Sequence, residues 1–194
     1  MFNSDLDQAD CADAIFALQQ LGERAVEFDE DLMLAFIEQK KAFDCVNREE
    51  LWAVLEDYGV HAELLDGIRA LYKDSEAMIR TDGGNTNWFD VTSGVRQGCV
   101  LSPLLLIVYM DRVTREANGD ETKLIDSLFA DEMSLMHKEE SELQEHVAAL
   151  DEAVENYGMR ISMEKTRVMN IGRDSKELKT EIKGKQLTQV KEFK

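Results

Sequence analysis

Two adjacent carboxylates interrupt the apolar stretch "LIDSLFADEMSLM" (residues 124–136), and this pattern constrains the fold more than any other in the chain. The apolar segments on either side of Asp131 and Glu132 predict two buried strands joined in a hairpin, with the acids at its tip. Because neighbouring like charges repel each other, the two acids either are ordinary solvated turn residues or hold a cation. A second apolar run, "LMLAFI" (32–37), has the length of another buried strand.

Apolar residues three and four positions apart predict helices between these strands. The helical segments are expected over residues 10–28, 47–59, 62–72, 102–113 and 141–158. In the first of them, one apolar face comprises Ile15, Leu18, Leu21, Ala25 and Phe28. Asn47 with Glu50 resembles a capping box, and Ser102 is predicted to be an N-cap before Pro103.

Two further segments are predicted to contain strands. Residues 76–93 carry the turn sequence "DGGN" (82–85) between two extended stretches, and residues 159–172 form two short strands around Glu164-Lys165. Strands that alternate with helices but are joined by hairpins predict an α+β fold, with helices packed on one face of an antiparallel sheet. The 194 residues contain one proline and no low-complexity linker, so a single domain is expected.

The charge distribution argues against a general nucleic-acid-binding surface. The formal net charge is −18, whereas proteins that neutralise phosphates normally present a basic surface. Residues 158–194 hold 10 Lys/Arg and 5 Asp/Glu, so residues 1–157 hold the other 12 bases and 35 acids and carry −23. A polyanion is therefore expected to contact the C-terminal segment or a few local bases.

The remaining composition supplies mainly exclusions. Cys11, Cys45 and Cys99 are too few and too far apart for a disulfide framework or a metal-ligand motif, and we expect them to be buried as small hydrophobic residues. The three histidines are scattered and receive no role. No apolar run is long enough for a membrane span and the N-terminus lacks signal-peptide features, so an intracellular location is expected, either nuclear or cytoplasmic.

Three separated features share one possible chemical use. The first apolar run ends at Glu38, the glycine loop "SGVRQGCVLSP" (93–103) leads into a helix, and the hairpin carries Asp131 and Glu132 at its tip. Two Mg²⁺ ions can activate an attacking oxygen and stabilise a departing pyrophosphate when carboxylates converge on them from separate elements.

Four segments in this order resemble successive motifs of the reverse transcriptases of non-LTR (LINE-type) retrotransposons. They are "LAFIEQKKAFDCVNREELWAVLEDYGV", "VTSGVRQGCVLSPLL", "FADEMSLM" and "GMRISMEKTRVM", and the similarity covers roughly residues 9–194. The resemblance implies a polymerase palm, with an antiparallel sheet backed by helices, plus part of the fingers. It divides the chain into a residual fingers helix (1–30), the palm (31–175) and the start of a truncated primer-grip region (176–194).

The resemblance also assigns roles to individual residues. The family's three metal-binding aspartates correspond to Glu38, Asp131 and Glu132, and its lysine proposed to protonate the leaving pyrophosphate corresponds to Lys165. The residues that line the nucleotide and template side correspond to Phe43, Arg96, Gln97 and Gly98, of which Phe43 excludes the ribose 2′-hydroxyl. By pattern alone, Phe43 could equally be a core residue, and Lys165 would form a surface pair with Glu164.

Departures from the family pattern predict weak or absent catalysis. Two of the three aspartates are glutamates, which place the carboxylate one methylene further from the backbone, whereas Mg²⁺ demands near-ideal geometry at about 2.0–2.1 Å. A misplacement near 1 Å costs roughly 10²-fold in rate. Relative to the family, the chain is also expected to lack much of the fingers and the whole thumb, and "DLDQADCAD" (5–13) replaces a basic glycine-arginine stretch.

Alternative functions therefore remain open. RNA-directed DNA synthesis would require Mg²⁺ or Mn²⁺, an RNA template, a DNA primer and deoxynucleoside triphosphates. A membrane is not expected to take part. The alternative is a relic or domesticated palm that acts through an unknown protein partner. A structural Ca²⁺ or Mn²⁺ site is a third possibility, although no loop of EF-hand spacing supports it.

Overall fold

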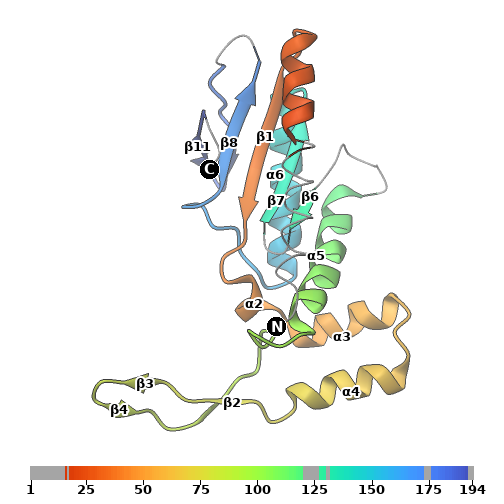
Figure 1. The fold of residues 1–194 in the computed structure, drawn as a ribbon, viewed down its shortest axis with the longest axis vertical. Helices are drawn as coiled ribbons and strands as arrows, with labels where there is room; N and C mark the ends of the chain where they lie inside the picture. The colour runs from red at the N-terminus through yellow and green to blue at the C-terminus, as the bar shows by residue number, and fades with distance from the viewer. Residues whose placement is uncertain (1–15, 17, 120–126, 130–131, 173–175, 192–194) are drawn as a thin grey trace.

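Five strands form the central sheet, in the spatial order β11-β8-β1-β7-β6 (Figure 1). Their bounds are β1 (Leu32–Glu38), β6 (Ser127–Phe129), β7 (Glu132–His137), β8 (Arg167–Ile171) and β11 (Thr188–Gln189). Strand β1 pairs antiparallel with both β7 and β8, while β11 runs parallel to β8. The computed structural model describes residue 16 and residues 18–119, 127–129, 132–172 and 176–191.

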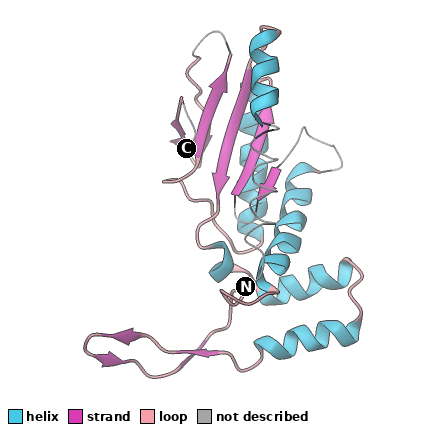
Figure 2. Ribbon diagram, in the orientation of Figure 1, coloured by secondary structure: helices cyan, strands magenta, loops and turns pink. Residues whose placement is uncertain are grey.

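The helices are α2 (Ala42–Cys45), α3 (Arg48–Asp57), α4 (Ala62–Tyr72), α5 (Ser102–Asn118) and α6 (Glu140–Asn156), preceded by an N-terminal helix over residues 18–27. Three short strand pairs lie outside the central sheet: β2 (Glu76–Ala77) with β5 (Phe89–Asp90), β3 (Arg80–Thr81) with β4 (Gly84–Asn85), and β9 (Glu181–Ile182) with β10 (Lys185–Gln186). Figure 2 shows that β2–β5 form an arm extending away from the sheet.

The side chains of β1 enter two different cores, because successive strand residues point to opposite faces of the sheet. Met33, Ala35 and Ile37 belong to the main core, which also contains the buried faces of α5 and α6. Leu34 instead packs with Met136 of β7 and Ala25 of the N-terminal helix. Both faces of β1 are therefore covered, which explains why its sequence is continuously apolar rather than alternating.

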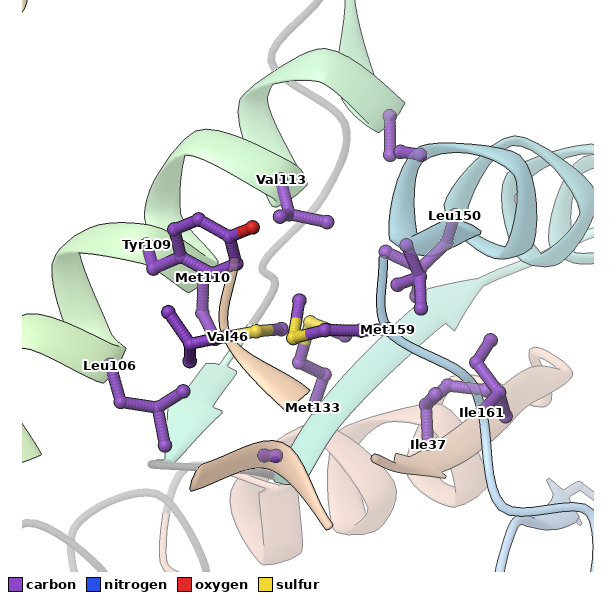
Figure 3. Close-up of a cluster of buried hydrophobic side chains, with 14 of the residues drawn as sticks. Ile37, Val46, Leu106, Tyr109, Met110, Val113, Met133, Leu150, Met159 and Ile161 are labelled. Carbon is purple, nitrogen blue, oxygen red and sulfur yellow. The ribbon is translucent and has the colours of Figure 1, made fainter. Parts of the chain in front are cut away.

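The main core lies between the sheet and the pair α5 and α6 (Figure 3). The helix residue Tyr109 is fully buried there, and its hydroxyl donates a hydrogen bond to the carbonyl oxygen of Tyr157 at 2.8 Å. Burial raises the pKa of this hydroxyl, so it stays a neutral donor. The hydrogen bond ties α5 to the end of α6, directly behind the strands that carry the candidate site.

The predicted α+β class is confirmed, and several elements agree closely. Helix α4 has the predicted bounds, and the Asn47 side chain caps α3 by accepting hydrogen bonds from the backbone N–H groups of Glu49 and Glu50. The predicted hairpin is present as β6 and β7, but Glu132, which was expected at its tip, is the first residue of β7 and pairs with Phe129. Two details of the predicted arrangement are wrong. Helices cover both faces of the sheet rather than one, because the N-terminal helix packs on the face opposite α5 and α6, and the parallel β11–β8 pair makes the sheet mixed rather than antiparallel.

Four local predictions are wrong. Phe28 lies in the turn after the N-terminal helix and is 63% exposed rather than buried. Ser102 is the first residue of α5 rather than its N-cap, and its buried hydroxyl lies 3.3 Å from that of Tyr72. Of the two strands expected in residues 159–172, only β8 forms; the other is reduced to a single bridge between Ile161 and Gln39.

The fourth concerns the cysteines. Cys45 and Cys99 are free thiols that are only partly buried, because Cys45 ends the short helix α2 and Cys99 lies in the glycine loop before α5. Cys11 lies outside the described residues. Among the helices that the structure describes, none combines the length and the apolar character needed to cross a membrane.

Candidate active site

The antiparallel register of β1 and β7 places Glu38 directly opposite Glu132. Residues opposite each other in such a pair have Cβ atoms about 4.5–5.5 Å apart, so two of the predicted metal-binding acids start from neighbouring backbone positions. Phe129 of β6 is the partner of Glu132 on the other side. Asp131 lies outside the described residues, as does the side chain of Glu132.

Lys165 forms an ion pair with Glu38, although 127 residues separate them in sequence. A turn closed by the Lys165 N–H on the carbonyl oxygen of Ser162 brings the lysine to the end of β1. The same segment is held against β1 because the backbone N–H of Ser162 donates to the carbonyl oxygen of Glu38 at 2.7 Å. Lys165 thus pairs with an acid on a different element of the fold, at the end of β1.

The carboxylates of Glu38, Asp131 and Glu132 are of the chemical type that binds a hard divalent cation, because carboxylate oxygens are the ligands that Mg²⁺ prefers. Within the described residues, no group of three or more His, Cys, Asp or Glu side chains is arranged to hold a metal. The half-buried Glu38 carboxylate already pairs with an ammonium group. A cation that uses Glu38 must therefore compete with Lys165 for it.

The glycine loop packs tightly against the short helix α2. Backbone hydrogen bonds join the Gly94 N–H to the Val46 carbonyl at 2.8 Å and the Val95 N–H to the Phe43 carbonyl at 2.7 Å. Gly94 has φ = +79°, and a Cβ added there would lie 2.7 Å from the Phe43 oxygen and 2.8 Å from the Asp44 oxygen. Only glycine satisfies both constraints, so this contact sets how close the loop comes to Phe43.

The three exposed loop residues Arg96, Gln97 and Gly98 follow this contact. Gln97 Nε2 donates to the Asp44 carboxylate at 3.3 Å, while an Arg96 terminal nitrogen donates to Ser75 Oγ at 3.1 Å. The structure therefore brings the loop and the half-buried Phe43 together, between α2 and the segment that follows α4. Phe43 also packs against the main core, so it satisfies the core interpretation as well as lying beside the loop.

Sequence reasoning missed two residues of this region. Gly94 lies in the glycine loop, and its position two residues before the Arg-Gln-Gly sequence could have indicated a site where only glycine fits. Arg48 gave no signal, because its partners are backbone carbonyls of residues 72 and 91–94. Partial burial lowers the pKa of the Arg48 guanidinium, an effect that Tyr72 opposes and Arg96 reinforces.

Two of the three histidines, His137 and His146, take part in a hydrogen-bonded chain within the fold. The ring nitrogens His137 Nε2 and His146 Nδ1 are 2.9 Å apart, and His146 Nε2 contacts Asn118 Oδ1. His146 is fully buried, so this chain of hydrogen bonds links β7, α6 and α5 behind the sheet.

Comparison with known proteins identifies the class to which this fold and site belong. The family model described as reverse transcriptase (RNA-dependent DNA polymerase) matches residues 9–194. The chain belongs to the reverse transcriptase family.

Its relatives place it more narrowly, in the non-LTR retrotransposon type, which confirms the predicted kinship. It is 26% identical over 157 residues to the Pol polyprotein of the type-1 retrotransposable element R2 of Nasonia vitripennis, covering 78% of this chain and 15% of that protein. It is 30% identical over 82 residues to that of the type-2 element R2DM of Drosophila melanogaster, covering 42% and 8% respectively. The chain thus spans less than a quarter of the length of these relatives.

Solved structures with a similar fold are telomerases. The telomerase of Candida albicans, in a complex with a fragment of telomeric RNA, aligns with a TM-score of 0.66 and 14% identity over 86% of this chain and 31% of its own. That of Candida tropicalis aligns with a TM-score of 0.63 and 15% identity over 89% and 32%. These matches confirm the palm-like fold.

Proposed function

We propose that this chain is the reverse transcriptase domain of an RNA-directed DNA polymerase of retrotransposon origin, acting by two-metal nucleotidyl transfer with impaired activity. The observation that carries the proposal is the register that sets Glu38 opposite Glu132 at the end of β1. An RNA template, a DNA primer and deoxynucleoside triphosphates are the substrates, and they meet the chain where the glycine loop approaches Phe43.

The residues that would hold Mg²⁺ or Mn²⁺ are Glu38, Asp131 and Glu132. Two ions held there would activate the primer 3′-oxygen and stabilise the leaving pyrophosphate. The chain's own residues orient the reactants: Phe43 packs beside the ribose of the incoming nucleotide, and the loop residues Arg96 to Gly98 line its base and template side. Lys165 supplies a proton to the pyrophosphate.

Impairment follows from the length of the two glutamates. Each extra methylene moves a carboxylate that Mg²⁺ needs at a defined distance, and a displacement near 1 Å costs roughly 10²-fold in rate. The Glu38 carboxylate also forms an ion pair with Lys165. In this pair, the carboxylate is less available to bind a metal ion and the ammonium group is less available to donate a proton.

Primer extension on an RNA template tests the proposal. We expect slow incorporation by the natural chain and an increase of roughly 10²-fold for the double variant Glu38→Asp with Glu132→Asp, because both carboxylates return to the shorter reach. Asp131→Ala, made in the restored background, is the control that removes a ligand and should abolish the gain. A restored chain that extends no primer would reject the polymerase and favour a palm that acts through protein contacts. A natural chain as fast as the double variant would reject the impairment.

Removing the competing ammonium group is expected to strengthen cation binding. Lys165→Met should lower the Mn²⁺ concentration that raises the melting temperature, because the metal no longer displaces an ion pair from Glu38. At a concentration of 100 Kd, a bound ion stabilises the folded state by about 2.7 kcal/mol. Lys183→Met is the matched control, since Lys183 pairs with Asp151 and Glu155 of α6 instead. Identical Mn²⁺ responses in both variants would show that Lys165 does not compete at the site.

A further inference from the structure

Arg48, the first residue of α3, directs its guanidinium group at backbone carbonyls rather than at an acid. Its Nε donates to the Gly94 oxygen at 2.9 Å, and its two terminal nitrogens donate to the oxygens of Val91 at 2.7 Å and Ser93 at 3.2 Å. One terminal nitrogen also lies 3.4 Å from the Tyr72 oxygen. A single side chain thus gathers three carbonyls from the four-residue segment 91–94, which only the planar fork of an arginine can reach together.

The segment held by Arg48 leads directly into the candidate nucleotide loop. Gly94 is pressed against the carbonyl oxygens of Phe43 and Asp44, where no Cβ fits. On the same side, Ser93 Oγ lies 3.3 Å from the Asp44 oxygen, to which it donates. The Arg48 guanidinium group therefore holds one side of this segment, and the backbone of α2 contacts the other side. The position of Phe43 relative to Arg96, Gln97 and Gly98 depends on both contacts.

The ring of Tyr72 couples Arg48 to Arg96. The guanidinium carbon of Arg48 lies 5.0 Å from the ring centroid and that of Arg96 lies 5.8 Å from it, within the range of a cation–π interaction. Ser75 extends the link, since its hydroxyl accepts from Arg96 and donates to the Tyr72 carbonyl. Tyr72 itself is buried at the end of α4.

Two other arginines of this chain have side-chain partners instead. Arg69 pairs with Glu56 and Arg112 pairs with Asp57, each through a terminal nitrogen of a partly exposed side chain, and Arg112 also forms a hydrogen bond with the side chain of Tyr157. Arg48 has four backbone carbonyls within hydrogen-bond distance, all of them in the segments that carry the loop and its tyrosine.

We infer that Arg48 is a positioning residue of the nucleotide site, which holds residues 91–98 against α2 and so sets the separation between Phe43 and the Arg96–Gly98 loop. The inference rests on the proposed polymerase function, because that function gives the loop its ligand, a deoxynucleoside triphosphate. The ordering of the loop by Arg48 can be measured without any nucleotide.

The first test uses the natural chain and NMR of the arginine side chains. The Nε–H of Arg48 should exchange with solvent at least about tenfold more slowly than those of Arg69 and Arg112, because it donates to the carbonyl of a buried glycine. Equal exchange rates would overturn the inference. No variant is involved, so a folding defect cannot obscure the result.

The second test is Arg48→Lys, which keeps the charge but loses the fork, with Arg112→Lys as the matched control. The amides of Gly94 and Val95 should exchange at least about tenfold faster in Arg48→Lys, while the amides of β1 and β7 keep their rates. Uniformly faster exchange throughout the sheet, or an unchanged loop, would overturn the positioning role.

The functional arm is carried out in the Glu38→Asp, Glu132→Asp background. Adding Arg48→Lys should raise the KM for the deoxynucleoside triphosphate by roughly tenfold and change kcat by less, because the loop contributes to nucleotide binding. Arg112→Lys should change neither constant. If the Glu38→Asp, Glu132→Asp variant incorporates no nucleotide, the polymerase function is refuted, but the exchange rates still decide whether Arg48 orders the loop. If that variant is active and Arg48→Lys leaves its KM unchanged, the link between Arg48 and nucleotide binding is refuted.

Discussion

The substitution Gly94→Ala is expected to lower the free energy of unfolding by about 3 kcal/mol or more, as measured by urea denaturation. Two costs combine at this position. The backbone has φ = +79°, which an L-residue adopts at a cost of about 1–2 kcal/mol, and the new methyl group would lie 2.7 Å from the Phe43 oxygen. Relief requires the loop to move away from α2, since backbone rather than a flexible side chain stands in the way.

Gly98→Ala separates the two costs within the same loop. Gly98 has nearly the same φ, +81°, but no atom lies within 4 Å of the Cβ position. Only the conformational cost of about 1–2 kcal/mol is expected there. Equal losses in the two variants would mean that the loop yields without penalty, and the close approach of Gly94 to α2 would no longer account for the position of the loop.

The substitution Leu106→Ala is expected to destabilise the protein by about 2–5 kcal/mol, because it removes a fully buried side chain from the main core and leaves a cavity (Figure 3). Globular domains have a total stability of only about 5–15 kcal/mol, so the melting temperature should fall sharply. The same core contains Val46, which ends α2, and Met133, which is part of β7, so the loss should also loosen the candidate site.

Leu104→Ala provides the matched control for this cavity. It makes the same chemical change in the first turns of the same helix, but Leu104 is 58% exposed. Its expected cost is within about 0.5 kcal/mol. Comparable losses at both positions would indicate that helix formation, rather than core packing, dominates the stability of α5.

The sequence predicts elements best where their causes are local. Helix α4 has the predicted bounds because its apolar residues recur at helical spacing, and α3 begins where Asn47 can cap it. The wrong predictions concern tertiary surroundings. Phe28 continues the apolar spacing of the first helix, but the chain turns before it, and Ser102 finds a buried neighbour in Tyr72 and so does not serve as a cap.

The candidate site divides in the same way. Its residue types and their order along the chain are readable from the motifs, including the unusual glutamates at positions 38 and 132. Their proximity depends on the β1–β7 register, which pairs positions 94 residues apart. The Lys165 ion pair and the carbonyl contacts of Arg48 depend further on how a turn and a loop pack onto that sheet.

The amino-acid sequence by itself determined the α+β class, the kinds of element and the chemical groups available for a reaction, because periodicity, caps and motifs act over a few residues. Only the tertiary structure decided which groups meet: Glu38 with Lys165, Gly94 with α2, and Arg48 with the carbonyls of residues 91–94. Such contacts are set by long-range packing and backbone hydrogen bonding, and the partners cannot be recognised from the local sequence pattern.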